Sequence, residues 1–367
     1  MNTVTPRIFI AATEQDTGKT TVSLGLYKAL QQRFQQIGYI KPVGQRFTEV
    51  DGQRIDDDSI LIQSIFDTRI PIEHMSPIAV EPDFTRRYIN NSNHESLVKR
   101  IQNSFDRSAW EKEFTIVEGS GHAGVGSVFD LSNATVARIL HSKVVLVAPG
   151  GIGKPIDEVA LNKALFEREG IEVIGVVMNK VLEGKIDSIA EIARRGFDRL
   201  GLELLGVIPL QKELTVPSLN QINRKIGGSF AANPNLGRNL AFEHMIGAPS
   251  SGNVFRKLSP GTLLITPGDR EDIILAAIDE SLTPCGGRLA GLILSDDLHP
   301  HPSLLEMLRQ APLPVIISKS DCYTIARRIH SLPIKIEPGD TMKIQNIQHL
   351  VARHVDINRL LEKTGCR

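Results

Sequence analysis

The sequence of 367 residues lacks the features that mark secreted or membrane proteins. It has only three cysteines, Cys285, Cys322 and Cys366, which are too few and too scattered for a disulfide framework or a zinc site. It has no apolar run long enough to cross a bilayer, and no basic and then apolar leader precedes its first strand. We therefore expect a soluble protein in a reducing, cytoplasmic setting, with no membrane partner.

A net charge is lacking as well, because 42 acidic residues balance 42 basic ones. A balanced surface has no general attraction for nucleic acid or anionic lipid, so we expect no nucleic acid partner. The length suffices for two or three domains with a sizeable core.

What is present begins with a strand, a tight loop and a helix. Residues 7–12 are an apolar run, a helical pattern follows the loop, and Gly18, Lys19 and Thr20 stand at the helix start. This is the arrangement of a phosphate-binding P-loop, whereas a chance Gly-Lys-Thr in a surface loop would lack the flanking elements. The loop amides and the helix dipole favour phosphate, Lys19 adds a mobile charge, and the Thr20 hydroxyl can take one Mg²⁺ position. The usual motif begins with Gly five residues before Gly18, and that position here is Thr13.

Polar side chains follow two other predicted strands. Lys41 follows residues 37–40, where Pro42 ends the strand, and Glu118 follows residues 113–117. The carboxyl ends of parallel strands form the edge at which open α/β sheets bind ligands. Glu118 can hold Mg²⁺ there, whereas Lys41, taken alone, is equally well explained as a solvated lysine.

Two further groups are candidates for the same edge. The run from Asp56 to Asp58 opens a helical segment; such a run is usually a solvated helix start, and the alternative is that one aspartate faces Mg²⁺. Asn179 ends the predicted strand 173–178, where its amide can donate to and accept from a purine edge.

The pattern along the chain predicts an α/β fold. Further apolar strands at 143–148 and 204–209 alternate with helices, which indicates a parallel sheet covered by helices on both faces. Residues 45–54 are polar and loop-like, and residues 71–93 resemble a long loop on the substrate side.

Composition divides the chain into two predicted domains. The first spans residues 1–226, a junction rich in Gly, Asn and Pro spans 227–251, and a smaller α/β domain spans 252–367. The strands predicted for the second domain are 262–266, 289–294, 315–318 and 334–336.

Residues 12–20 resemble the phosphate loop of dethiobiotin synthetases, which also has Thr in place of the first Gly. Residues 41–43, Lys-Pro-Val, and 117–119, Val-Glu-Gly, are similar to motifs of that family, and the resemblance covers about residues 7–225. It implies a P-loop NTPase fold, ATP and Mg²⁺ as ligands, and a homodimer. The implied nucleotide-binding residues are Thr13, Glu14, Asp16, Thr17, Gly18, Lys19, Thr20, Thr21 and Asn179. The implied Mg²⁺ ligands are Thr20, Asp58 and Glu118, and the implied catalytic residues are Lys19 and Lys41.

A closer resemblance is to the dethiobiotin-synthetase-like N-terminal region of long bacterial phosphotransacetylases. It rests on residues 119–122, 129–134 and 150–158. Residues 265–272 and 320–324 resemble the DRTGG domain that follows in those enzymes, although Ser-Asp-Asp replaces the expected Thr-Gly-Gly at 295–297. The sequence ends without the large acetyl-transferring domain, so acetyl transfer is not expected.

Two functions follow from these resemblances. The first is ATP-dependent activation of a carboxylate or carbamate of an unidentified small-molecule acceptor for carbon–nitrogen ligation, as in dethiobiotin synthetase and cobyrinic acid amide synthases. Residues 79–90 do not match the substrate loop of dethiobiotin synthetase, so that particular reaction is not expected. The alternative is a nucleotide-sensing regulatory protein.

Overall fold

The computed structural model describes residues 2–283 and 287–366. The chain forms two compact units, of which the first extends to Leu210 and resumes at Glu337. The second unit is Gln211–Ile336, so it is inserted within the sequence of the first.

A six-stranded sheet forms the centre of the first unit. Its strands are β1 (Arg7–Ala12), β2 (Ile37–Ile40), β7 (Phe114–Glu118), β8 (Lys143–Pro149), β9 (Val173–Val181) and β10 (Leu204–Pro209). All pairs are parallel, in the order β10-β9-β8-β1-β7-β2. The predicted parallel sheet is confirmed, and the loop after β1 opens at the middle of its carboxyl edge.

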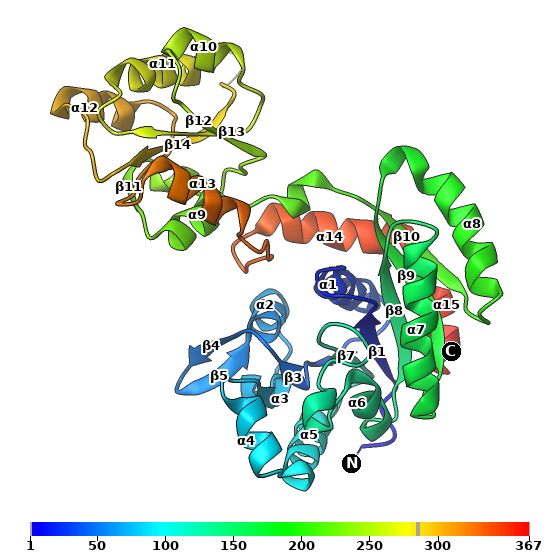
Figure 1. Ribbon diagram of the computed structural model, residues 1–367. Coiled ribbons are helices and arrows are strands. Elements are labelled where there is room, and N and C mark those ends of the chain that lie inside the picture. Colours follow the sequence, from blue (N-terminus) through cyan, green and yellow to red (C-terminus); the bar gives the residue numbers. More distant parts are fainter. Residues whose placement is uncertain (1, 284–286, 367) are drawn as a thin grey trace. The chain divides into compact units, whose positions relative to one another are not determined.

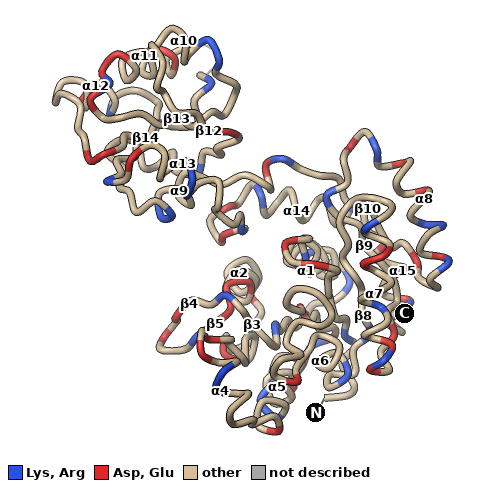
Figure 2. Tube along the Cα trace, in the orientation of Figure 1, with Lys and Arg blue, Asp and Glu red and all other residues tan. Residues whose placement is uncertain are grey.

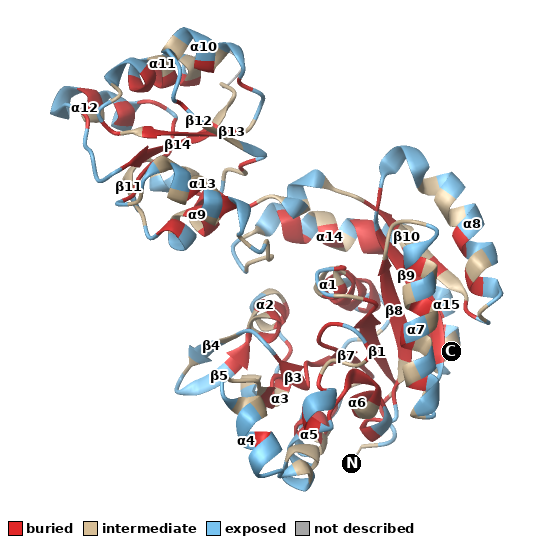
Figure 3. Ribbon diagram, in the orientation of Figure 1, coloured by how far each residue is buried: buried red, intermediate tan, exposed pale blue. Residues whose placement is uncertain are grey.

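Helices cover both faces of this sheet (Figure 1). The helices of the first unit are α1 (Lys19–Leu30), α2 (Asp57–Ile65), α3 (Ile72–Met75), α4 (Phe84–Asn90), α5 (His94–Ser108), α6 (Asn133–Ile139), α7 (Lys154–Arg168), α8 (Ile186–Asp198), α14 (Thr341–His354) and α15 (Ile357–Thr364). Side chains of α5 to α8 join Phe9, Ala11 and Val117 of the strands in one buried apolar cluster. Figure 3 shows the strands as buried and the outer helix faces as exposed, which is the pattern that continuous apolar strands predict.

The prediction of a loop at residues 45–54 is wrong. β4 (Phe47–Val50) and β5 (Gln53–Asp56) form an antiparallel hairpin with Val50 opposite Gln53. The two turn residues, Asp51 at φ 49° and Gly52 at φ 74°, are both left-handed. Asp-Gly is a favoured pair for such a turn, so the sequence carried a hairpin signal that the polar composition obscured.

Residues 71–93 are also more ordered than predicted. They contain α3, α4 and the short strand β6 (Ile78–Ala79), which pairs in parallel with β3 (Val43–Gly44). Phe84 of α4 packs edge-on against Phe129, with ring centroids 5.2 Å apart. This contact links residues far apart in sequence, so local pattern alone did not reveal it.

The second unit contains a five-stranded sheet in the order β11-β15-β14-β13-β12, in which only the β11–β15 pair is antiparallel among the described strands. The bounds are β11 (Ser229–Ala232), β12 (Glu243–Ile246), β13 (Thr262–Pro267), β14 (Leu289–Ser295) and β15 (Val315–Ile317). Its helices are α9 (Leu219–Ile226), α10 (Ser251–Arg256), α11 (Glu271–Ser281), α12 (Pro302–Gln310) and α13 (Cys322–His330). The predicted junction 227–251 therefore supplies two strands, and residues 334–336 are not the strand that was predicted.

The domain assignment of the C-terminal residues differs most from the prediction. Residues from Glu337 onward, assigned to the second domain by sequence, belong to the first unit. At Gly25 of α1 an added Cβ would lie 2.3 Å from Cγ2 of Val351 in α14, so the two helices are in close contact. The amide of Asp356 also donates to the carbonyl of Leu205, 2.8 Å away, next to β10.

Three features of the described residues concern charge, apolar helices and thiols. In Figure 2 basic and acidic residues are interspersed along both units. No helix among the described residues is long and apolar enough to span a membrane. Cys322 and Cys366 are free thiols, and Cys285 lies outside the described residues.

Candidate functional site

The loop between β1 and α1 begins with a residue that still pairs with the sheet and ends in a glycine with a left-handed backbone conformation. The amide of Thr13 donates to the carbonyl of Val147 at 3.0 Å, which extends the pairing of β1 with β8 by one residue. Gly18 has φ 101°, and an added Cβ there would lie 2.1 Å from Nδ2 of Asn179. Only glycine fits this position, because it combines a left-handed backbone with the close approach of a buried side chain.

Neighbouring segments hold the loop in place by bonds to its carbonyl groups. Nδ2 of Asn179 donates to the carbonyl of Thr17 at 2.8 Å, and Nζ of Lys180 donates to the carbonyl of Asp16 at 2.5 Å. The Thr17 hydroxyl donates to the carbonyl of Glu14 at 2.8 Å. With its carbonyls bonded to these donors, the loop leaves its amides for an anionic ligand. Asn179 therefore has a clear structural role, and its contact with adenine stays a prediction.

The first turn of α1 is suited to phosphate. In the described part of the chain no side chain caps this helix, and its first turn, which includes Lys19, Thr20 and Thr21, has no acidic residue. The unpaired amides and the helix dipole give this end a partial positive charge. The residues present therefore fit a phosphate group.

Lys19 is a largely buried cation at this helix start. Burial lowers the pKa of its ammonium, the charge of Glu118 opposes that effect, and the nearby charge of Lys41 adds to it. The charges of Glu118 and Asp58 both act to raise the pKa of Lys19 against the effect of burial. An anion at the helix start would stabilise the charged form of Lys19.

Glu118 is the centre of the site and is fully buried at the carboxyl end of β7. Its Oε1 accepts a hydrogen bond from the Thr20 hydroxyl at 2.8 Å, and its Oε2 accepts one from the Tyr39 hydroxyl at 3.0 Å. Burial, together with the charge of Glu118, raises the pKa of Tyr39 well above its ordinary value, so this phenol remains a donor. Both carboxylate oxygens are thereby fixed in orientation.

Lys41 lies among three carboxylates. Its Nζ forms a hydrogen-bonded ion pair with Asp58 and lies 3.2 Å from Oδ1 of Asp56 and 3.7 Å from Oε1 of Glu118. Burial alone would lower the pKa of Lys41, but the three acids reverse that effect and raise it. The interpretation of Lys41 as an ordinary solvated lysine is therefore wrong.

The three residues predicted to bind Mg²⁺ meet around this cluster. Thr20 is hydrogen-bonded to Glu118, and Asp58 is paired with Lys41, which in turn lies beside Glu118. Hydroxyl and carboxylate oxygens are the ligand atoms that Mg²⁺ prefers. Among the described residues no set of three His, Cys, Asp or Glu side chains is arranged to hold a metal by itself. The donor set fits a metal that takes its remaining ligands from phosphate oxygens and water.

Sequence reasoning missed Tyr39 and named Asp56 only as a member of the run from Asp56 to Asp58. Tyr39 precedes Lys41 by two positions, and side chains two apart on a strand share a face, so its place could have been read from the period of the strand. Asp56 caps α2 by accepting from the amide of Asp58 at 3.0 Å, and it also faces Lys41. That double role depends on the hairpin that ends at Asp56, which was not predicted.

Comparison with known families covers most of the chain. The AAA domain family AAA_26 matches residues 6–218, more than half of the sequence. The DRTGG domain family matches residues 221–332.

Two curated relatives are phosphate acetyltransferases. The protein from Nitratidesulfovibrio vulgaris is 27% identical over 363 residues, which cover 96% of this chain and 51% of the relative. The protein from Pseudomonas aeruginosa is 29% identical over 376 residues, which cover 97% of this chain and 52% of the relative. The chain spans about half the length of these relatives, and the match lies in their N-terminal region.

Two solved structures are also similar. MinD in the MinC–MinD cell division complex of Aquifex aeolicus is 16% identical with a TM-score of 0.37, covering 57% of this chain and 83% of that one. The CBS and DRTGG domains of the Clostridium perfringens pyrophosphatase regulatory region, complexed with diadenosine tetraphosphate, are 16% identical with a TM-score of 0.28. They cover 44% of this chain and 75% of that one. From its own sequence matches, this chain belongs to the AAA_26 family of AAA domains, joined to a DRTGG domain as in the N-terminal region of phosphate acetyltransferases.

Proposed function

We propose that this protein binds Mg²⁺-ATP in its first unit and acts as a nucleotide-sensing regulatory protein. The observation that carries the proposal is the hydrogen bond from Thr20 to Glu118, directly beside the uncapped start of α1. It brings a hydroxyl and a carboxylate to the place where the metal of a bound nucleotide lies in P-loop proteins.

The roles of the residues follow from their positions. The amides of residues 14–20 and the ammonium of Lys19 bind the phosphates, while Thr20, Asp58 and Glu118 hold the metal. A Mg²⁺ ion held by these three residues would neutralise part of the phosphate charge. Asn179 supports the loop through Thr17 and donates no further hydrogen bond to described residues, so a contact with the base is open to its remaining N–H.

Two observations favour sensing over the ligase that the sequence suggested first. The charge of Lys41 is already compensated by Asp58 and Asp56, whereas a lysine that stabilises a transferring phosphoryl group must offer its charge to that group. The two relatives described above, which cover 96% and 97% of this chain, are phosphate acetyltransferases and give no support to carbon–nitrogen ligation.

Calorimetry tests the binding. Titration with ATP, with and without Mg²⁺, is expected to show binding that Lys19→Ala abolishes. Lys28→Ala is the matched control, because Lys28 is an exposed lysine in the last turn of the same helix. Absence of ATP binding to the unaltered protein, or equal binding by both variants, would overturn the nucleotide site.

Phosphate release tests sensing against ligation. A sensor is expected to release little phosphate from ATP, and mixtures of carboxylate and diamine metabolites should not increase the rate. A metabolite-dependent increase that Lys19→Ala removes would reject the sensor and restore the ligase.

A further inference from the structure

A polar cavity of about 910 Å³ lies in the first unit between the β4–β5 hairpin, α3 and α5. Its lining includes Arg54 of the hairpin, Ser76 after α3, and Arg100 and Ser104 of α5. None of these side chains belongs to the proposed nucleotide site. The volume is in the range of cavities that hold small-molecule ligands.

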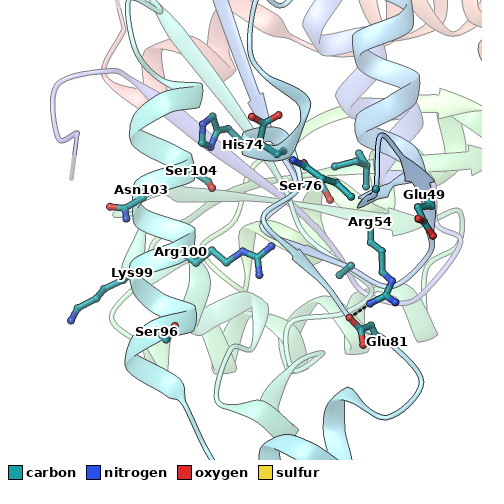
Figure 4. A pocket seen from close by; sticks show the side chains of 15 residues that line it. Glu49, Arg54, His74, Ser76, Glu81, Ser96, Lys99, Arg100, Asn103 and Ser104 are labelled. Carbon is teal, nitrogen blue, oxygen red and sulfur yellow. Dashed lines mark hydrogen bonds and ion pairs between the residues drawn. The ribbon is translucent and has the colours of Figure 1, made fainter.

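One face of α5 supplies a wall of this cavity. Residues 96, 99, 100, 103 and 104 line it, and this spacing places them on one face of a helix. Ile101 and Phe105 are fully buried, so the opposite face is in the core. Figure 4 shows Arg100 extending from α5 toward Arg54, whereas Lys99 points away from it.

The facing wall presents a second guanidinium, that of Arg54. Arg54 forms an ion pair with Glu81, and the other oxygen of Glu81 accepts from Nη2 of Arg87 at 2.7 Å. Glu81 is therefore shared by two cations, and its charge is neutralised. Among the described residues the side chain of Arg100 has no hydrogen bond or ion pair, so its charge is available to a ligand.

We propose that this cavity binds a small anionic metabolite whose carboxylate or phosphate lies between Arg100 and Arg54. Guanidinium groups bind such anions in a bidentate manner, and two of them on facing walls select a planar or tetrahedral oxyanion. Glu49 and Glu73 also line the cavity, and their carboxylates can accept hydrogen bonds from donor groups elsewhere on the ligand. The ligand therefore has an anionic group and at least one donor group.

The cavity is connected to the proposed nucleotide site by hydrogen bonds. The amide of Asp56 donates to the Ser76 hydroxyl at 2.9 Å, and the carboxylate of Asp56 faces Lys41. The amide of Lys41 donates to the carbonyl of Met75 at 2.8 Å, so the segment beside the cavity holds Lys41 from two sides. A ligand that moves this segment would change the surroundings of Lys41 and so couple the cavity to the nucleotide site. This coupling rests on the proposed nucleotide function, whereas the cavity site does not.

Calorimetry on the whole protein tests the site with three probes: O-phosphoserine, succinate and inorganic phosphate. We expect at least one probe to bind, and Arg100→Ala to weaken it about tenfold or more. Arg107→Ala is the matched control, because Arg107 is an exposed arginine on α5 outside the cavity. The first two probes distinguish a phosphate ligand from a carboxylate ligand, and binding of inorganic phosphate alone would overturn the proposal of a metabolite site.

The proposal is overturned if none of the probes binds at millimolar concentration, or if Arg100→Ala and Arg107→Ala weaken binding equally. Lys19→Ala separates this outcome from failure of the nucleotide site, because that variant should lose ATP and keep the probe. A saturating probe is expected to change the ATP affinity several-fold, and an unchanged affinity would reject the coupling.

Discussion

The hydroxyl of Thr20 donates to Oε1 of Glu118 across 2.8 Å, although 98 positions separate the two residues in sequence. Thr20 lies in the first turn of α1 and Glu118 is the last residue of β7. Adjacent parallel strands bring these two ends together, because β1 and β7 are paired and both end at the same edge. The candidate metal position is thus a product of sheet topology.

The first prediction concerns this hydrogen bond. Thr20→Val keeps the shape of the side chain and removes its hydroxyl, so we expect the Mg²⁺-dependent part of ATP affinity to fall roughly tenfold, or about 1.4 kcal/mol. Calorimetry with and without Mg²⁺ measures the change. Thr20→Ser keeps the hydroxyl and should bind normally. A loss in Thr20→Ser with no loss in Thr20→Val would show that the methyl group, not the oxygen, matters.

The second prediction concerns Tyr39. Tyr39→Phe removes a hydrogen-bond donor to the fully buried Glu118. We expect the free energy of unfolding, measured in urea, to fall by about 1.5–3 kcal/mol, which is typical of a hydrogen bond to a charged group. Tyr27→Phe is the comparison, because the Tyr27 hydroxyl donates to the neutral carbonyl of Ile37 at 2.9 Å. Its expected cost is about 0.5–1.5 kcal/mol. A larger cost at Tyr27 than at Tyr39 would contradict the expectation that the hydrogen bond to the carboxylate is the stronger of the two.

The third prediction concerns Lys41 and pH. Lys41→Met leaves buried carboxylates uncompensated, so we expect a loss of about 3–5 kcal/mol in the free energy of unfolding at pH 7. The pKa of Lys41 is raised by folding from its ordinary value of 10.5. Its contribution is therefore fully present below pH 10.5 and is lost as the pH rises through the folded-state pKa.

Urea unfolding of the unaltered protein and of Lys41→Met, compared from pH 7 upward, measures this difference. The gap between the two curves should stay constant up to about pH 10 and shrink only above the ordinary lysine pKa. A second variant, Lys41→Met with Asp58→Asn, removes one of the charges and should recover part of the loss. A gap that widens with rising pH would contradict a raised pKa for Lys41.

The fourth prediction concerns the contact between α1 and α14. An alanine in place of a helical glycine normally stabilises a helix by roughly 1 kcal/mol. At Gly25 the added methyl would meet Val351, so we expect Gly25→Ala to destabilise the protein by about 1–3 kcal/mol instead. Thermal unfolding gives the sign directly. Adding Gly25→Ala to Val351→Gly should cost less than adding it to the unaltered protein, because Cβ and Cγ2 of Val351 would lie 2.4 Å and 2.3 Å from the added methyl and glycine has neither. A stabilising Gly25→Ala in the unaltered protein would show that α14 does not pack there.

Sequence reasoning was most successful where local pattern and topology agree. The apolar strands predicted the parallel sheet, and Gly18, Lys19 and Thr20 predicted the start of α1. The meeting of Lys41 with Glu118 followed from the carboxyl ends of two strands, which share an edge in any parallel sheet. These inferences needed only strand direction, which the alternation of strands and helices provides.

The failures have different physical causes. The hairpin at Asp51 and Gly52 was readable from its turn residues, but polar composition was given more weight. Residues 334–336 have an apolar and β-branched pattern without a strand beside them, and the carbonyl of Lys335 accepts from Nε2 of Gln221 instead. The partner of α14 was not readable at all, because an apolar helix face specifies burial but not the element that covers it.

The insertion of Gln211–Ile336 has a further consequence. Since the first unit is made of two chain segments, its integrity does not depend on an unbroken backbone through the second unit. After a single proteolytic nick within that insertion, the packing of Val351 beside Gly25 and the bond from Asp356 to Leu205 still hold the two segments together. The nicked protein would migrate as one species under native conditions and as two fragments once denatured.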